Sequence, residues 1–193
     1  MFAGFSELSP AQLTLYTDAL IITGSVRTRQ RRVTDMLNHA EEPFFVLEDV
    51  TTVEFGPGGT RSHAEYAQVN LEAVLFAVAH DPVTTSPELR MAKLPERALV
   101  SVPPFKVLGT IHLIPAEGNL RTSLSSLTGR FLPVTDAIYW SDRVGEERRD
   151  ALLVAVNHRR AQILAPYRES GAADNEGADP TAADPEVEAA EGA

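Results

Sequence analysis

The chain of 193 residues is 44% hydrophobic, enough apolar material for one substantial core or two small ones. It contains no cysteine, which excludes disulfides, thiolate metal ligands and cysteine nucleophiles. The formal net charge is −10, but the eight acidic residues of segment 169–193 leave only −2 for residues 1–168. That balance disfavours nucleic-acid binding, and no apolar run approaches the roughly 20 residues that span a membrane. We therefore expect a soluble protein of the bacterial cytoplasm.

An internal repeat is the main organising feature. A shift of 87 residues brings apolar and acidic positions into coincidence at near-constant spacing. The pairs are Val33 with Leu120, Leu37 with Leu124, Phe44 with Phe131, Asp49 with Asp136, and Val69-Asn70 with Val156-Asn157. We predict a first repeat over 1–80, a connector over 81–97, a second repeat over 98–168 and a disordered acidic tail over 169–193. The tail is a solubilising extension or a docking segment for a basic partner.

Each repeat begins with a long apolar, β-branched segment, residues 13–28 in the first copy and 98–114 in the second. We predict one strand for each segment. The first is expected to bend near Thr17-Asp18. The second is expected to bend, or to lie at a sheet edge, at Pro103-Pro104, because proline cannot donate to a sheet ladder.

A short amphipathic helix is predicted next, because apolar residues recur at helical spacing. In the first copy Thr34 or Thr28 is expected to cap it and Pro43 to end it, and in the second Gly129 is expected as its C-terminal cap. The apolar faces comprise Val33, Met36, Leu37 and Ala40 in the first copy, and Leu120, Leu124 and Leu127 in the second.

The remaining elements complete each copy. Strands are predicted over 44–55 and 131–141, with the glycines of 56–60 allowing a tight reversal after the first. The third elements, 64–79 and 151–165, fit strand or helix, and we favour strand. The expected fold is α+β, mainly β: two strand–helix–strand–strand repeats with pseudo-two-fold symmetry. They would form a partly open β-barrel or twin small sheets, sharing one core or packed as subdomains.

The stretch RVTDMLN at 32–38, followed by FFVLEDV at 44–50, resembles a bacterial domain family of unknown function with an R-x-[ST]-D-x-L-N motif. The second copy keeps FLPVTDA at 131–137, but Thr122 and Ser125 replace the Asp and Asn of the motif. The resemblance supports two tandem copies and implies no activity.

The candidate site is the arginine-rich segment before the first predicted helix. Its residues are Arg27, Arg29, Arg31, Arg32, Asp35 and Asn38. Guanidinium groups beside free helix N–H groups suit a phosphate or carboxylate, or an acidic partner. The structural alternative is a solvated basic face, with Asp35 in the first helical turn and Asn38 closing the last turn or bonding to the following loop. Arg27 and Arg31 also have the RxxxR spacing of some cyclic-dinucleotide receptors, although the second motif of those receptors is lacking.

No catalytic motif is found. There is no Gly-x-Ser-x-Gly elbow, segment 56–60 lacks the Lys-Ser/Thr of a phosphate loop, and the five histidines have no metal-ligand spacing. No cofactor is indicated. The first hypothesis is therefore a non-enzymatic protein-interaction or adaptor module that uses its sheet edges or the arginine-rich rim. The second is a sensor of a small anionic ligand beside Arg29, Arg31 and Arg32, and the third is an enzyme with an unrecognised site. A homo-oligomer is compatible with all three.

Overall fold

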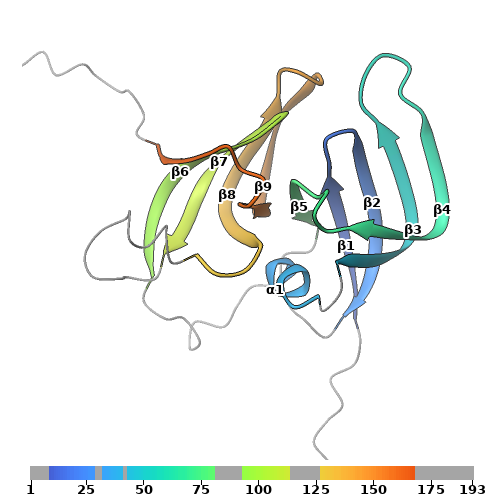
Figure 1. Cartoon of the computed structure of the whole chain (residues 1–193), viewed down its shortest axis with the longest axis horizontal. Helices are drawn as coiled ribbons and strands as arrows, with labels where there is room; N and C mark the ends of the chain where they lie inside the picture. The colour runs from blue at the N-terminus through green and yellow to red at the C-terminus, as the bar shows by residue number, and fades with distance from the viewer. Residues whose placement is uncertain (1–8, 29–31, 41–42, 81–92, 114–126, 168–193) are drawn as a thin grey trace, which may run out of the picture.

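The computed structural model describes residues 9–28, 32–40, 43–80, 93–113 and 127–167, which form ten β-strands and one short helix (Figure 1). The mainly-β prediction is confirmed. No helix among these residues is long and apolar enough to cross a membrane. The elements are β1 (Ser9–Tyr16), β2 (Leu20–Thr28), α1 (Val33–Asn38), β3 (Phe44–Glu54), β4 (Arg61–Asn70), β5 (Phe76–Ala79), β6 (Leu94–Val102), β7 (Phe105–Leu113), β8 (Phe131–Ser141), β9 (Glu146–Asn157) and β10 (Ile163–Pro166).

All ten strands belong to a single antiparallel sheet in the order β10-β6-β7-β8-β9-β5-β1-β2-β3-β4. The pairing of β5 with β9 joins the strands of residues 9–80, the first half, to those of residues 93–167, the second half. The alternative of twin small sheets is therefore wrong. The sheet is open, because it ends at β4 and β10 and these strands do not pair with each other.

Each half contains five strands where three were predicted. The segments expected to be single bent strands are hairpins, β1–β2 and β6–β7. In the first hairpin the Thr17 hydroxyl accepts from the Leu20 amide at 2.9 Å, and the Thr17 amide donates to the Leu20 carbonyl. A reversal this tight contains no Gly or Pro, so the sequence reads as a continuous strand. The third elements are strands, as favoured, but each is two: β4 with β5, and β9 with β10.

Other boundaries also differ from the prediction. The first helix ends at Asn38, so Ala40 and Pro43 lie beyond it. Arg32 occupies its N-cap without a side-chain capping hydrogen bond, and the prediction of Thr34 as the cap is wrong because Thr34 lies buried inside the helix. Thr28, the other predicted cap, is the last residue of β2. β6 begins at Leu94, within the predicted connector. The second predicted helix lies almost entirely outside the described residues, as does the acidic tail.

The two halves pair their strands in the same order and register. The order β5-β1-β2-β3-β4 in the first half matches β10-β6-β7-β8-β9 in the second. Backbone hydrogen bonds just beyond the strand ends also recur: Leu71 N–H to Pro43 O corresponds to His158 N–H to Arg130 O, 87 residues later for both partners. Likewise, Leu75 N–H to Tyr16 O corresponds to Gln162 N–H to Ser101 O. The paired positions of the strands in one half therefore match those in the other.

An irregularity of β3 recurs in β8. Asp49 and Asp136 have positive φ values of 52° and 48°, and the register of each strand with its preceding neighbour shifts beside them. Gly24 on β2 lies so close to β3 that a Cβ would meet the Glu48 carbonyl at 3.1 Å. The shift lets Leu47 and Val50, three residues apart, both point into the core.

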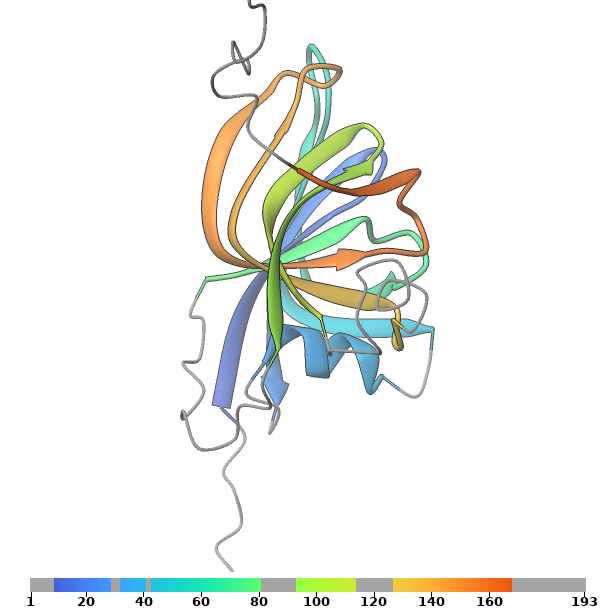
Figure 2. The ribbon, with the colours of Figure 1, turned by 90° about the vertical axis from the view of Figure 1, so that its left-hand side faces the viewer.

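The apolar side chains form two cores on opposite faces of the central strands. Along β5, Phe76 and Val78 enter one core while Ala77 enters the other, as alternation along a strand requires. The first core is built from the first half together with Phe131 and Ala155. The second core is built from the second half together with Tyr16, Leu75, Phe76 and Val78. The two halves of the sheet therefore curl toward opposite faces (Figures 1 and 2).

A cluster of aromatic side chains holds the second core together across the junction. Tyr16 from β1 stacks on Phe76 with ring centroids 4.3 Å apart and meets Phe105 edge-on at 5.4 Å. Its hydroxyl hydrogen-bonds with that of Tyr139 on β8, with 3.0 Å between the oxygens. Burial and this hydrogen bond raise the pKa of Tyr16 well above its usual range.

We predict that residues 1–90 expressed alone will be unfolded or will self-associate, because each core takes buried residues from both halves. Circular dichroism and sedimentation of the fragment test this. A fragment that is monomeric and unfolds cooperatively would show instead that the first half is an independent domain.

Alkaline pH should destabilise the protein through Tyr16. Above about pH 10 an unfolded tyrosine loses its proton, whereas the buried Tyr16 retains it, so the unfolding free energy falls as pH rises. Tyr16→Phe should make the free energy of unfolding, measured by urea titration between pH 9 and 11, depend less steeply on pH. An unchanged dependence would show that other groups determine it.

Candidate functional site

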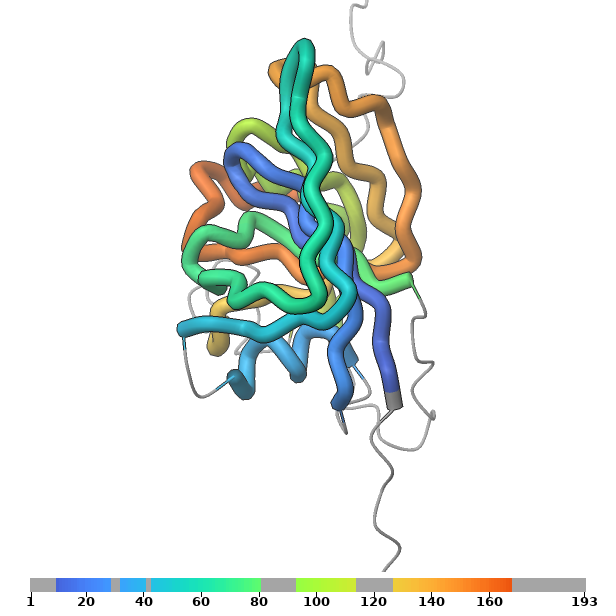
Figure 3. Tube along the Cα trace, turned by 90° about the vertical axis from the view of Figure 1, so that its right-hand side faces the viewer, coloured from blue at the N-terminus to red at the C-terminus, as the bar shows by residue number. Residues whose placement is uncertain are grey.

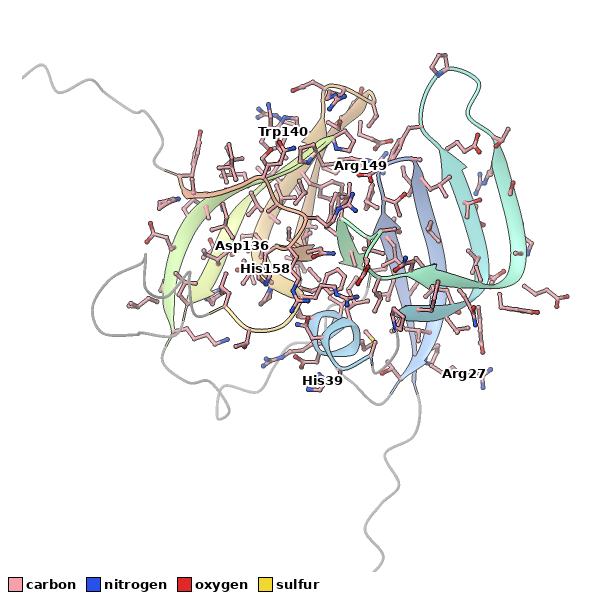
Figure 4. All side chains as sticks on the ribbon, in the orientation of Figure 1. Arg27, His39, Asp136, Trp140, Arg149 and His158 are labelled. Carbon is pink, nitrogen blue, oxygen red and sulfur yellow. The ribbon has the colours of Figure 1, made fainter. Side chains whose placement is uncertain are left out.

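The structure describes only part of the predicted arginine-rich site. Arg27 lies at the end of β2 with its side chain pointing outward (Figure 4), and its Nε is 3.5 Å from the Glu48 carboxylate. Arg29 and Arg31 lie outside the described residues. Arg32 is the N-cap of α1, a helix of only six residues. The described part of the segment therefore shows an ion pair across β2 and β3, and the anion site stays a prediction.

Asn38 has a structural role that differs from the predicted closure of the helix. Its Oδ1 accepts from the Arg130 and Phe131 amides, both at 2.8 Å, and its Nδ2 donates to the Phe131 carbonyl at 2.8 Å. These bonds attach α1, in the first half, to the start of β8, in the second. Gly129 permits the contact, because its φ is +84° and a Cβ there would lie 3.0 Å from the Asn38 amide group.

Asp35 stays near its predicted place. It lies in the first turn of α1 and its carbonyl accepts from the His39 amide at 2.9 Å. The apolar face of the helix is confirmed, since Val33, Met36 and Leu37 are buried in the first core. The described contacts of RVTDMLN, which are the burial of its apolar side chains and the hydrogen bonds of Asn38, therefore stabilise the fold.

Asn38→Ala should lower the free energy of unfolding by about 1–3 kcal/mol, because it leaves backbone groups of β8 without partners. Asn38→Asp, which keeps the acceptor and loses the donor, should give a smaller loss. Chemical denaturation measures both, with the exposed Gln12→Ala as control. Equal stability of Asn38→Ala and wild type would contradict this role.

His80 is the described histidine that bonds to a threonine hydroxyl on β1. His80 Nε2 lies 2.8 Å from Thr14 Oγ1, which is 3.1 Å from Thr23 Oγ1. A general base needs a third group to orient it, but no described carboxylate pairs with His80. Within the described ranges no three potential ligands cluster around a possible metal position.

Two open depressions lie on the surface of the described strands, among others. One of about 210 Å³ lies beside the hairpin turn at Pro103-Pro104, where Ser141 Oγ donates to the Pro104 carbonyl. The other, of about 630 Å³, runs over the outer face of β3 and β4. It combines Val46 and Tyr66 with the carboxylates of Glu48, Asp49 and Glu65.

The outer strands at the two ends of the sheet carry most of the exposed large apolar side chains. Tyr66 on β4 is 69% exposed, Phe44 on β3 is 47% exposed, and Ile163 on β10 is 57% exposed. Figure 3 looks onto the β4 end, where the β3–β4 hairpin lies in front of the other strands. Among the described strands, β4 pairs only with β3, and β10 pairs only with β6. Each end thus combines an unpaired backbone edge with apolar side chains.

The sequence pattern predicts the sheet edges in general as an interaction surface, and it indicates none of these residues. The repeat aligns Phe44 with Phe131, but Phe131 is buried whereas Phe44 is exposed. Only the strand order reveals that difference, because it places β8 inside the sheet and β3 next to its end. The chain matches no family model, no curated protein sequence and no solved structure.

Proposed function

We propose that the chain is a non-enzymatic protein-interaction module of the bacterial cytoplasm that binds partners along the two ends of its sheet. The proposal rests on the strand at each end of the sheet, β4 and β10, which has one unpaired backbone edge with exposed apolar side chains beside it. Edge strands are templates for the addition of a further strand, in which backbone hydrogen bonds give affinity and side-chain pockets give specificity.

The residues at the edges fit this role. Tyrosine and phenylalanine supply large contact areas at protein interfaces, and Phe44 and Tyr66 lie on adjacent strands at the β4 end. At the other end, Ile163 and Tyr167 are exposed. The open depressions and the engaged Arg27 support a docking surface better than an enclosed ligand site.

Internal duplication is part of the same proposal. It is supported by the matching strand order, by the hydrogen bonds that recur 85 to 87 residues later, and by the shared irregularity at Asp49 and Asp136. A duplicated unit explains why the chain carries two edges of corresponding construction. The pseudo-two-fold relation between the copies stays a prediction.

Partner capture should depend on the edges. The tagged full chain is used to purify partners from its source cells, and mass spectrometry quantifies proteins other than the bait. Tyr66→Lys combined with Ile163→Lys should reduce the captured partners about tenfold or more, the effect expected when interface anchors are lost. Leu152→Lys, which changes a side chain that is also 69% exposed but lies inside the sheet on β9, should not.

The competing hypotheses give different results in the same experiment. Replacing Arg29, Arg31 and Arg32 with Gln should leave capture unchanged if the edges bind the partners. Loss of capture in this arginine variant, with capture intact in the edge variant, would support the arginine-rich rim and overturn the proposal.

A further inference from the structure

We propose that one partner of the edges is a second copy of this chain, bound head to tail, with β4 of one copy pairing antiparallel with β10 of the next. This inference rests on the proposed function and names its partner. It follows from the pairing of β9 with β5, because the free edges β4 and β10 are the structural counterparts of β9 and β5.

The pairing of β5 with β9 inside the chain, called the internal joint below, shows the geometry of such a pairing. β5 and β9 pair with Phe76 opposite Val156, Ala77 opposite Ala155 and Val78 opposite Val154. The Asn157 amide donates to the Leu75 carbonyl at 2.9 Å. All of these side chains are buried, so the joint is dry and closely packed.

The correspondence between the halves predicts the register of the new joint. In the shared strand register, β10 pairs with β6 as β5 pairs with β1, and β4 pairs with β3 as β9 pairs with β8. Segment 163–165 therefore holds the place of 76–78, and segment 67–69 holds the place of 154–156. The predicted register places Ile163 opposite Val69, Leu164 opposite Gln68 and Ala165 opposite Ala67 of the neighbouring copy.

The exposed apolar residues at the edges match residues that are buried or partly buried near the internal joint. Phe44, 47% exposed, corresponds to Phe131, 1% exposed. Tyr66 corresponds to Leu153, which packs against the first core. At the other edge Ile163, 57% exposed, corresponds to Phe76, which is 0% exposed. In the head-to-tail joint these side chains would enter the open sides of the cores of the neighbouring copy.

An asparagine that forms hydrogen bonds at the internal joint has a counterpart at the free edge of β4. Asn157 is buried, and its Nδ2 donates to the carbonyls of Leu71 and Val74 in the connection between β4 and β5. Its counterpart on β4 is Asn70, the same residue type, which is exposed. In the proposed joint Asn70 would hold the β9–β10 connection of the neighbouring copy.

The correspondence favours a head-to-tail joint over one between two identical edges. At the internal joint a β9-type edge meets a β5-type edge, and the side chains of the two differ in size and shape. A joint between unlike surfaces leaves one free edge of each kind on the outer copies, so assembly continues until a ring closes or a filament grows.

Disulfide cross-linking tests the register, because the chain contains no native cysteine. Ala67 and Ala165 are small, partly exposed and predicted to face each other. They correspond to Val154 and Val78, a pair without mutual backbone hydrogen bonds, whose Cα atoms are typically about 4.5 Å apart. That separation lies within the range for a disulfide.

Purified Ala67→Cys and Ala165→Cys chains should form a covalent dimer when they are mixed and oxidised, and neither should do so alone. Mixing Leu152→Cys with Ala165→Cys serves as the control and should give no dimer. A dimer from Ala67→Cys alone would show that identical edges pair, and would overturn the inference.

Sedimentation velocity over a concentration series supplies a second readout. The average mass of the wild-type species in solution should rise with protein concentration. Association should be weakened about tenfold or more by Phe44→Lys, Tyr66→Lys or Ile163→Lys, and should be unchanged by Leu152→Lys. A wild-type chain that stays monomeric and gives no cross-link overturns the inference. Edge-dependent capture of other proteins would then leave the proposed function standing, and its absence would remove both.

Discussion

The pairing of the four-residue strand β5 with β9 is the interaction on which the rest of the structure depends. It connects the two halves of the sheet, and its alternating side chains supply both cores at once. Phe76 and Ala77 are neighbours in the chain, are both fully buried, and face opposite cores. Burying a phenylalanine contributes about 1.5–3 kcal/mol. A short strand can therefore stabilise two hydrophobic clusters, and Asn157 and Asn38 attach connecting segments to the same region.

The free edges are a consequence of this junction. Because the halves curl toward opposite faces, the outermost strands remain unpaired with each other. Natural proteins protect edge strands with charges and prolines. Here Arg61, His63 and Glu65 occupy the part of β4 nearest its hairpin turn, whereas segment 67–69 carries no charge. The unprotected part of this edge is thus the part whose counterpart on β9 pairs with β5.

The sequence predicts the strand content and the local periodicity well, and the order of the strands in the sheet poorly. The strand content, the amphipathic face of α1 and the matches of Phe44 with Phe131 and of Asp49 with Asp136 follow from residue type and spacing. The tight turn at Thr17 carries no Gly or Pro, so it is hidden within an apolar run. The order of strands, and with it the exposure of Tyr66 and Ile163, depends on pairings between residues far apart in the chain. For the candidate site, the sequence predicts sheet edges in general without identifying their residues. The arginine-rich segment is predicted as a site from its charge alone.

The sharing of the cores has a consequence for the order of synthesis on the ribosome. The first half leaves the exit tunnel before Phe131 and Ala155, which its core requires, have been translated. The apolar surface of the first half therefore stays exposed until the second half is synthesised, although domains generally fold as they emerge. Newly made chains would be most vulnerable to aggregation and to chaperone binding during this interval. Selection on this protein would then act on the speed of translation through the second half as well as on the stability of the finished sheet.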